Sequence, residues 1–212
     1  MPHVIFHLLL VDTSLRSTSD KFGALLELMK LIQPSSADII AAAKPCTPLH
    51  WISLIILLDQ LPRNCFRDAK TGIVFTLFDK LALEVATQVL KLNIPAEEQV
   101  RFKLAYRFWF YMPMEHSERL EVQESLTKAH SDMWHDYEML LEESGDRWDS
   151  TLAQYRAVLL GRKNSFEQFR STVQGICESK KDILYRFGRF PQRNDALGRS
   201  STLEEIKWLK ES

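Results

Sequence analysis

The sequence predicts an all-α fold, an array of seven to nine antiparallel helices, and three observations lead to this prediction. Apolar residues recur three and four positions apart in several segments, which is the spacing of one helix face. No segment of useful length shows the alternation of a half-buried strand. Proline, glycine and capping residues separate the segments at short intervals, and short connections favour antiparallel neighbours.

The first helices are marked by clear boundary residues. Lys21 to Leu31 carries apolar residues in helical spacing, and a proline follows it. Ser35 with an aspartate three positions later forms a capping box for a short second helix. Thr47 followed by proline predicts the next start, because proline suits the first helical position. The helix His50 to Gln60 is apolar all round and is therefore expected at the centre of the fold.

Further helices are predicted along the rest of the chain. Gly72 to Leu92 is one, and the aromatic-rich segment from Ala96 to about Tyr111 is another. Ser117 can cap a long amphipathic helix that reaches about Glu143. A stretch from Asp149 to about Tyr185 follows, with a bend expected near its internal glycine at position 161. Ser201 and Glu204 predict a capping box for a last helix, residues 203–210.

Composition excludes several classes of protein. The chain has 212 residues, 45% of them hydrophobic and 26% charged, with a net charge of -1. A disordered chain would be poorer in apolar residues, and a generic nucleic-acid binder would carry a cationic excess. With only 7 Gly and 8 Pro, collagen-like and linker-rich chains are also excluded. We expect one domain over residues 1–212 and no nucleic-acid partner.

Cysteine usage and the absence of long apolar runs favour a cytoplasmic protein with no membrane partner. The three cysteines include no CxxC pair, which indicates reduced thiols rather than a disulfide framework or a zinc site. The apolar run from Val4 to Val11 is too short to span a membrane. It has no preceding lysine or arginine and no A-x-A site after it, so a buried strand or helix is favoured over a signal peptide.

Three polar clusters stand out against the helical background. They are residues 59–67, residues 111–118 and residues 186–202. The first and third echo each other, since an apolar residue, a proline and Arg-Asn recur as Leu61-Pro62-Arg63-Asn64 and Phe190-Pro191-Gln192-Arg193-Asn194. Both follow long helices, so the two segments could face each other at one end of the bundle. Their arginines would then form an electropositive pocket suited to a carboxylate or phosphate.

These clusters resemble the domain of unknown function 924 family. That family shows an LDQFPRN-FR stretch, a Y-x-P-x-EHSE stretch and an FGRFPHRN…LGR-ST-EE stretch, which are similar to residues 58–67, 111–118 and 187–205 of this chain. The resemblance covers about residues 45–212 and indicates a fungal-type member. It implies an all-α, tetratricopeptide-repeat-like array of antiparallel helix pairs. No general activity belongs to the family, so the resemblance implies a site without a reaction.

The chain departs from the family pattern at several positions. Leu61 replaces a usual phenylalanine, Gln192 a usual histidine, and Lys181 a common histidine. The segment before residue 40 lacks the family's FWF stretch, and residues 1–20 are the most divergent. The missing histidines leave His116 as the main imidazole candidate and weaken any mechanism that needs a histidine pair.

The candidate site combines acid–base groups with anion-binding groups. His116 and Glu115 are the candidate catalytic residues. The candidate ligand-binding residues are Asp59, Arg63, Asn64, Arg67, Glu118, Arg189, Arg193, Asn194 and Arg199. Two structural alternatives stay open: the arginines could instead form an ion-pair network with nearby carboxylates, and His116 could simply cap a helix start. The aromatic side chains Trp109 and Phe190 could cover the apolar part of a ligand, although aromatic residues belong to a core by default.

Three functions remain open. The first is binding of an anionic small molecule or peptide carboxylate. The second is a cofactor-independent enzyme of lyase, isomerase, cyclase or hydrolase type, with His116 as acid or base and arginines stabilising a developing anion. The third is a protein-interaction scaffold. No cofactor or metal is expected, because the common nucleotide and zinc motifs are absent and His130 and His135, five apart, do not share a helix face. The sequence does not indicate an oligomeric state.

Overall fold

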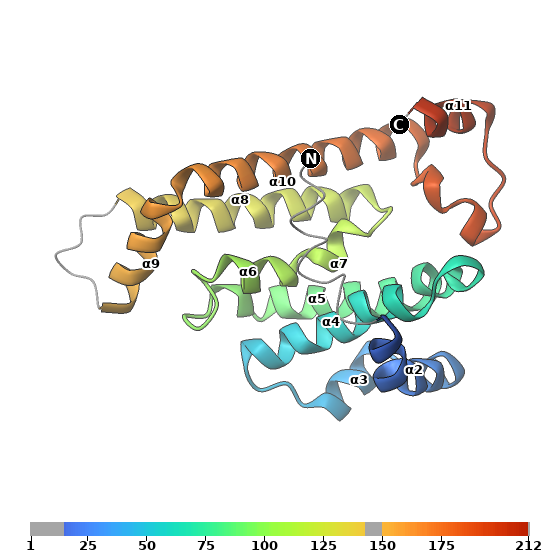
Figure 1. The fold of residues 1–212 in the computed structure, drawn as a ribbon, viewed down its shortest axis with the longest axis horizontal. Coiled ribbons are helices and arrows are strands. Elements are labelled where there is room, and N and C mark those ends of the chain that lie inside the picture. The colour runs from blue at the N-terminus through green and yellow to red at the C-terminus, as the bar shows by residue number, and fades with distance from the viewer. Residues whose placement is uncertain (1–14, 143–149, 212) are drawn as a thin grey trace.

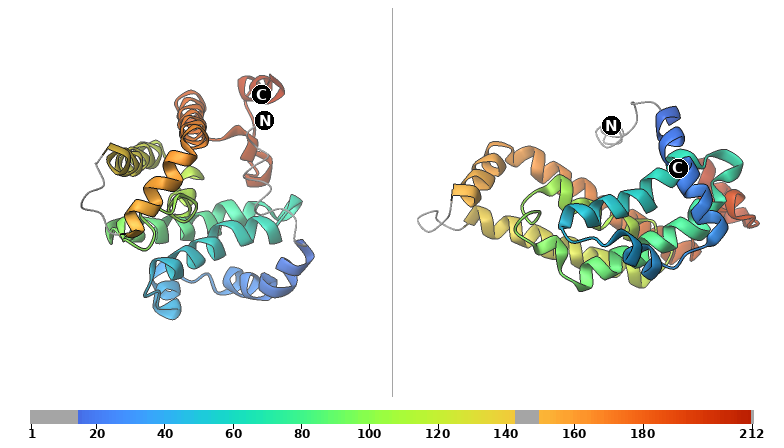
Figure 2. Two further views of the ribbon diagram at one scale, coloured as in Figure 1. Left: turned by 60° about the vertical axis from the view of Figure 1, so that its left-hand side comes forward. Right: turned by 90° about the horizontal axis from the view of Figure 1, so that it is seen from below.

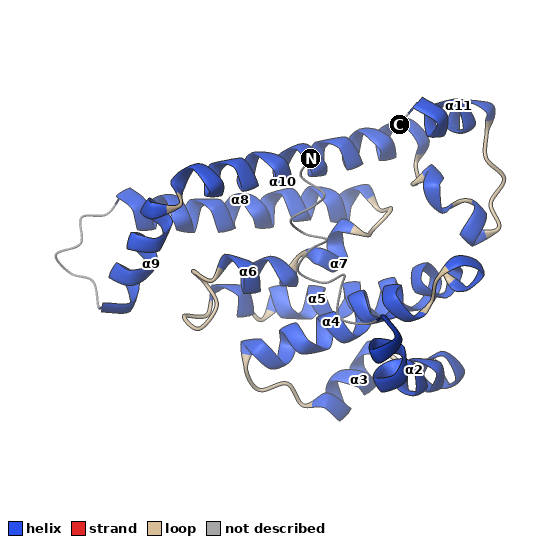
Figure 3. Cartoon of the chain, viewed as in Figure 1, coloured by secondary structure: helices blue, strands red, loops and turns tan. Residues whose placement is uncertain are grey.

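The all-α prediction is confirmed, although the helices are more numerous than expected. The structure, a computed structural model, describes residues 15–142 and 150–211. These two ranges contain ten α-helices and no strand (Figure 3). The number exceeds seven to nine because α6 (Leu104–Arg107) and α7 (Met112–Glu115) are single turns. The apolar run at residues 4–11 lies outside the described residues.

The first three helices are α2 (Leu15–Ile32), α3 (Ser36–Ala43) and α4 (Pro48–Cys65). Helices α3 and α4 begin where their capping residues predict, whereas α2 begins before the predicted Lys21. The Ser35 hydroxyl accepts a hydrogen bond from the Asp38 backbone and the Asp38 carboxylate accepts one from the Ser35 backbone, which completes the capping box. The Thr47 hydroxyl accepts from the backbone of His50, with proline in the first helical position. These local signals therefore set the helix starts correctly.

Helix α4 continues beyond the predicted end at Gln60. Residues Asp59 to Cys65 form its last turns, with Pro62 inside the helix rather than after it. The Phe66 N–H donates to the Pro62 carbonyl at 2.7 Å and closes the end. The helix is also not buried all round, because Ser53 is exposed. The prediction that the first polar cluster follows the helix is wrong for residues 59–65, which lie on its last turns, whereas Phe66 and Arg67 follow its end.

The predicted helix from Gly72 to Leu92 is present in two parts. A π-helical segment, η2 (Val74–Phe78), leads directly into α5 (Asp79–Lys91). Before it stands a short 3₁₀ turn, η1 (Asp68–Lys70). Helix α5 packs on α4, and their apolar faces form much of a first core together with Leu26 and Met29 of α2.

The aromatic-rich segment does not form the single predicted helix. Residues 94–115 instead break into η3 (Ile94–Ala96), α6, η4 (Phe108–Phe110) and α7. Phe110 belongs to the first core, whereas Phe108 and Tyr111 belong to a second core with α8 and α10. The segment therefore lies between the two cores and contributes rings to both.

The C-terminal half is built on two long helices that lie side by side, α8 (Leu120–Glu142) and α10 (Lys163–Phe187). Figure 1 shows them along one edge of the molecule, and both views in Figure 2 keep them together. Helix α9 (Ser150–Gly161) precedes α10, and the break after Gly161 confirms the predicted bend. The predicted capping box of the last helix, α11 (Leu203–Glu211), is shifted by one residue. Thr202 and Glu205 exchange the two capping bonds, at 3.2 and 2.7 Å.

After α10 the chain folds back toward the other half. Gly188, with φ of 68°, ends the helix in the left-handed conformation, and the short turns η6 (Pro191–Arg193) and η7 (Asp195–Leu197) follow. Figure 1 shows this segment descending from the end of α10 toward the turn before α5. A Cβ atom on Gly72 would lie 2.4 Å from the Ala196 carbonyl oxygen. This close backbone approach brings the third polar cluster of the sequence next to the first.

No described helix has the length and apolar character needed to cross a membrane.

Candidate functional site

Two arginines from distant parts of the chain meet at one buried carboxylate. The Arg63 guanidinium, on α4, lies 2.5 Å from Asp79, the first residue of α5. The Arg193 guanidinium, on η6, lies 3.4 Å from the other oxygen of Asp79. The prediction that the first and third clusters face each other is therefore confirmed. We refer to Asp59, Arg63, Asp79, His116 and Arg193 as the arginine–histidine centre.

The second cluster joins this centre through His116 and Asp59. Asp59 has no exposed surface, and its Oδ1 lies 3.4 Å from the His116 Nε2 and 3.5 Å from Arg63. The Gln60 amide donates to the other carboxylate oxygen. Burial alone would raise the pKa of Asp59, but the charges of His116 and Arg63 and the hydrogen bonds outweigh it and lower that pKa to about 2. Asp59 is thus a buried carboxylate that orients an imidazole.

A buried glutamine fixes the turn that carries His116. The Gln123 amide, on α8, donates to the carbonyl oxygens of Met114 at 3.0 Å and Ser117 at 2.8 Å. His116 is the C-cap residue of α7, so it lies at the end of a helix and the alternative that it caps a helix start does not hold. Its side chain is 19% exposed, so solvent can reach the imidazole, whose Nε2 lies beside the buried Asp59.

The pKa of Asp79 shifts in the opposite direction to that of Asp59. Burial raises the pKa of Asp79, and the repulsion from Asp59 adds to this, although Arg63, His116 and Arg193 pull it down. Burial likewise lowers the pKa of Arg193, with Arg63 and Arg199 acting in the same direction against the attraction of Asp79. Burial thus disfavours the charged forms of both Asp79 and Arg193, and the attraction between opposite charges at the centre does not fully offset this cost.

Arg193 is enclosed by two aromatic rings. The guanidinium carbon lies 4.4 Å from the ring centre of Phe75 and 5.2 Å from that of Phe190. Such cation–π contacts occupy the faces of the guanidinium and leave its edge for hydrogen bonds. Arg193 has a side-chain exposure of 12%, so its edge is reachable only from one direction.

Glu118 ties the second cluster to the third. It accepts two hydrogen bonds from the Arg199 guanidinium, at 3.0 and 2.8 Å, and one from the Phe190 backbone at 2.9 Å. Burial works to raise the pKa of Glu118, but these hydrogen bonds and the arginine charges lower it overall. The bidentate geometry is the strong form of such a pair.

Arg189 and Asn194 belong to the anchor of the last helix rather than to the centre. Arg189 grips Glu205 through two bonds, at 2.7 and 2.9 Å, and this grip lowers the pKa of Glu205 to about 2. The buried Asn194 amide donates to the hydroxyl of Ser201 at 3.0 Å. These side chains fix the C-terminal segment that presents Arg193.

The remaining predicted site residues lie elsewhere. The Glu115 side chain turns away from the centre and contacts Lys180 of α10, at 2.8 Å. Arg67 is exposed beyond the end of α4, and Asn64 is half-buried in its last turn. Trp109 packs against the first core. Glu115 and Arg67 are thus not brought to the arginine–histidine centre.

The predicted electropositive pocket is not what these contacts form. Arg63 and Arg193 share Asp79, Arg199 holds Glu118, and Arg189 holds Glu205. The alternative of an ion-pair network among the arginines is the one that this geometry matches. Any ligand at the centre must therefore compete with, or insert beside, existing carboxylate contacts.

Sequence reasoning missed Asp79 and Phe75. Both lie inside the predicted helix 72–92, outside every polar cluster. A signal for Asp79 was present, because it stands on an apolar face between Phe78 and Leu81, where an unpaired carboxylate would be costly. Phe75 carried no comparable signal.

Among residues 15–142 and 150–211, no group of three or more His, Cys, Asp or Glu side chains could hold a metal ion. His130 is buried in the second core while His135 is exposed, so the two do not converge.

Comparisons with known proteins establish the family. A search of curated proteins found no match. A solved structure, described as a protein of unknown function ATU0120 from Agrobacterium tumefaciens, is similar in fold, with a TM-score of 0.58 and 23% identity over 95% of this chain and 88% of that one. A family model described as "Bacterial protein of unknown function (DUF924)" matches residues 16–212, so the match extends well before residue 45, where the resemblance in sequence was expected to begin. The chain therefore belongs to the DUF924 family.

Proposed function

We propose that the chain binds a small anionic molecule, or the carboxylate of a peptide, at the arginine–histidine centre. The observation that carries this proposal is the incomplete pairing of Arg193. The one hydrogen bond that its guanidinium donates to a described residue is the 3.4 Å contact to Asp79, whose carboxylate Arg63 already holds more closely. A guanidinium has five N–H donors, so most of those on Arg193 stay available to a ligand.

The surroundings of Arg193 favour a ligand that is anionic and partly apolar. The rings of Phe75 and Phe190 lie against the guanidinium and displace water from it, which strengthens any charge pair formed beside it. His116 can donate a further hydrogen bond, and its orientation is fixed by Asp59. A carboxylate or phosphate matches this donor set, since arginine holds either in a two-point grip.

A thermal-shift screen against anionic metabolites tests the proposal, with Arg193→Ala as the probe variant and Arg67→Ala as its matched control. A ligand at 100 times its dissociation constant stabilises the folded state by about 2.7 kcal/mol. For a chain of this size that corresponds to about 5–10 °C. We expect the shift to persist in Arg67→Ala and to disappear in Arg193→Ala. A flat panel, with both variants folded, would contradict ligand binding at the centre.

The Asp59–His116 pair supports a second function, that of a cofactor-independent enzyme. A buried carboxylate lies 3.4 Å from one imidazole nitrogen and favours a proton on it, and the other nitrogen can then accept a proton from a ligand. Arginine at the same centre would stabilise a developing carboxylate or enolate charge. With a ligand in hand, His116→Gln should reduce turnover about 100-fold while affinity is kept. Loss of affinity without loss of turnover would favour binding alone.

The third candidate function is that of an interaction scaffold with a tetratricopeptide-like array, acting in the cytoplasm, as expected of a fungal-type member. Its support is the paired packing of α8 and α10 and fold analogy alone. In that case substitutions at Arg193 and His116 would leave partner binding unchanged in a pull-down, whereas both would matter for a ligand at the centre.

A further inference from the structure

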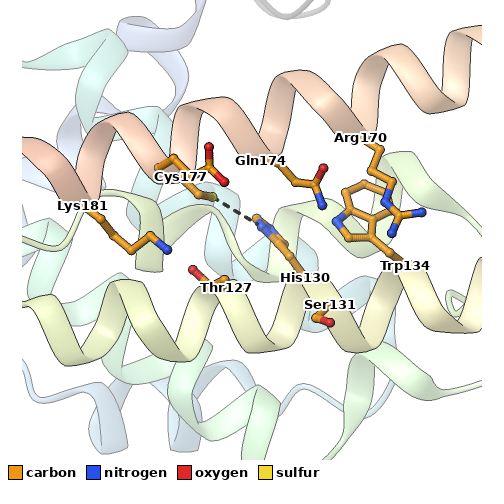
Figure 4. A pocket seen from close by; sticks show the side chains of 9 residues that line it. Thr127, His130, Ser131, Trp134, Arg170, Gln174, Cys177 and Lys181 are labelled. Atoms are coloured by element: carbon orange, nitrogen blue, oxygen red, sulfur yellow. Dashed lines mark hydrogen bonds between the residues drawn. The ribbon is translucent and has the colours of Figure 1, made fainter.

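A second cleft lies between α8 and α10, away from the arginine–histidine centre. Its volume is about 190 Å³, and its lining includes His130, Trp134, Cys177 and Lys181 (Figure 4). No candidate residue from the sequence motifs lies in it. At roughly 30 Å³ for each water, the cleft has room for about six water molecules, which suits a small metabolite rather than a drug-sized ligand.

The cleft contains a buried thiol–imidazole contact. The Cys177 Sγ lies 3.6 Å from the His130 Nδ1, and the dashed line in Figure 4 marks this contact. Burial raises the pKa of Cys177 to about 11 and lowers that of His130 to about 4, so both groups are neutral at pH 7. The neutral thiol can donate to Nδ1 when that nitrogen carries no proton, and in that tautomer the single proton of the imidazole resides on Nε2.

Two buried N–H donors of the lining residues have no partner. The Nε2 of His130 and the Nε1 of Trp134 accept or donate no hydrogen bond among the described residues. The two side chains are only 4% and 2% exposed. Buried N–H groups in folded proteins are nearly always paired with protein atoms or with something bound. These two groups are therefore the candidate donors for an acceptor bound in the cleft.

The charges around the cleft favour an anionic acceptor. Lys181 is half-buried in the lining and forms no ion pair with the described carboxylates, whereas its neighbour Lys180 is held by Glu115. Arg170 also lines the cleft, although Glu138 already contacts it at 2.6 Å. Glu178 is the one carboxylate of the lining, and it is exposed. An unpaired ammonium near two unpaired N–H donors forms a donor-rich surface.

We propose that the cleft between α8 and α10 binds a small organic anion, with Lys181 contacting its carboxylate or phosphate group and the N–H groups of His130 and Trp134 donating to its oxygens. This site is independent of the arginine–histidine centre. Cys177 serves there as a positioning residue, because its thiol sets which nitrogen of His130 carries the proton.

The indole N–H resonance of Trp134 in nitrogen-labelled protein provides the test. Propionate, its neutral isostere propionamide, and inorganic phosphate are titrated in turn. We expect the Trp134 resonance to shift and saturate with propionate, with phosphate, or with both, and the arm that responds identifies the anionic group. Propionamide should leave it unmoved. Trp51, which is buried in the first core, serves as an internal control and should not respond.

Three variants separate this site from its alternatives. Lys181→Gln should weaken binding about tenfold or more, since it removes a charge-assisted contact. Lys128→Gln, an exposed residue of α8 outside the lining, should leave affinity unchanged. Arg193→Ala should also leave the affinity of the cleft unchanged. An absence of ligand binding at the arginine–histidine centre would therefore not contradict the proposal for the cleft. The proposal is overturned if no anion saturates the Trp134 resonance, if propionamide acts like propionate, or if Lys181→Gln and Lys128→Gln behave alike.

Discussion

The ion pair between Glu118 and Arg199 should contribute measurably to stability, because it ties the segment after α10 to the turn before α8. Glu118 precedes α8, whereas Arg199 lies in the segment after α10. The two bonds of the pair measure 3.0 and 2.8 Å, and the side chains are 19% and 33% exposed. Hydrogen bonds to charged groups contribute about 1.5–3 kcal/mol when buried, and exposed pairs about 0.2–1 kcal/mol. The partial exposure of this pair places its coupling at about 1–2 kcal/mol.

A double-mutant cycle with Glu118→Ala and Arg199→Ala measures this coupling by urea unfolding. Glu118→Ala also strips the Phe190 N–H of its acceptor, but that loss occurs in both backgrounds and cancels in the cycle. Arg119 and Glu121 form the matched control, a 2.7 Å pair whose side chains are 66% and 63% exposed. Its coupling should stay below about 0.5 kcal/mol. Equal coupling in the two pairs would refute the argument that burial and bidentate geometry make the Glu118–Arg199 contact special.

Three further predictions concern stability. Gly72→Ala should lower the free energy of unfolding in urea by about 1–3 kcal/mol, because its Cβ would lie 2.4 Å from the Ala196 carbonyl oxygen. Gly175→Ala, whose Cβ would have nothing within 4 Å, should raise that free energy by about 0.5–1 kcal/mol. The reverse order of the two variants would contradict the close approach at Gly72. Burial lowers the pKa of His130 to about 4 in the folded protein, below its ordinary value of 6.5. The contribution of His130 to the free energy of unfolding should therefore be full above pH 6.5 and fall by up to about 3 kcal/mol as the pH drops toward 4. If the free energy of unfolding of His130→Gln depends on pH in the same way as that of the unchanged protein, this reasoning is refuted. Asp59 has a folded pKa of about 2 against an ordinary 3.8, so its contribution should persist above about pH 4 and be lost as the pH falls toward 2, and acid titration of Asp59→Asn by circular dichroism should lack that component.

Helix starts with local capping signals could be predicted from the sequence. Ser35 and Thr47 act through bonds within one helical turn, so their effect does not depend on the rest of the fold. The prediction of a single helix in the aromatic segment was wrong because the conformation of this segment depends on distant partners. Phe108 and Phe110 enter two separate cores, and no local pattern records which core takes which ring.

The sequence predicted that the first and third clusters meet, but it did not predict all the residues at the meeting point or how they pair. The repeated Pro and Arg-Asn pattern correctly indicated that Arg63 and Arg193 meet. It could not indicate that Asp79 lies between them, because Asp79 enters from a helix with no polar motif. Nor could it show that Glu115 faces Lys180, since a side chain's direction on a single helical turn depends on the helix packed against it.

The length of helix α10 determines where the segment that carries Arg193 is placed. With 25 residues and a rise of 1.5 Å for each, it spans about 37 Å between the α9 junction and Gly188. Deleting or inserting one residue would shift everything beyond it by 1.5 Å and rotate it by about 100°, carrying Arg193 away from Asp79. Changes of three or four residues would nearly restore the rotation, but they would still move the segment by about 5 Å along the helix axis. The length of α10 should therefore be kept among related chains wherever Arg193 keeps its place.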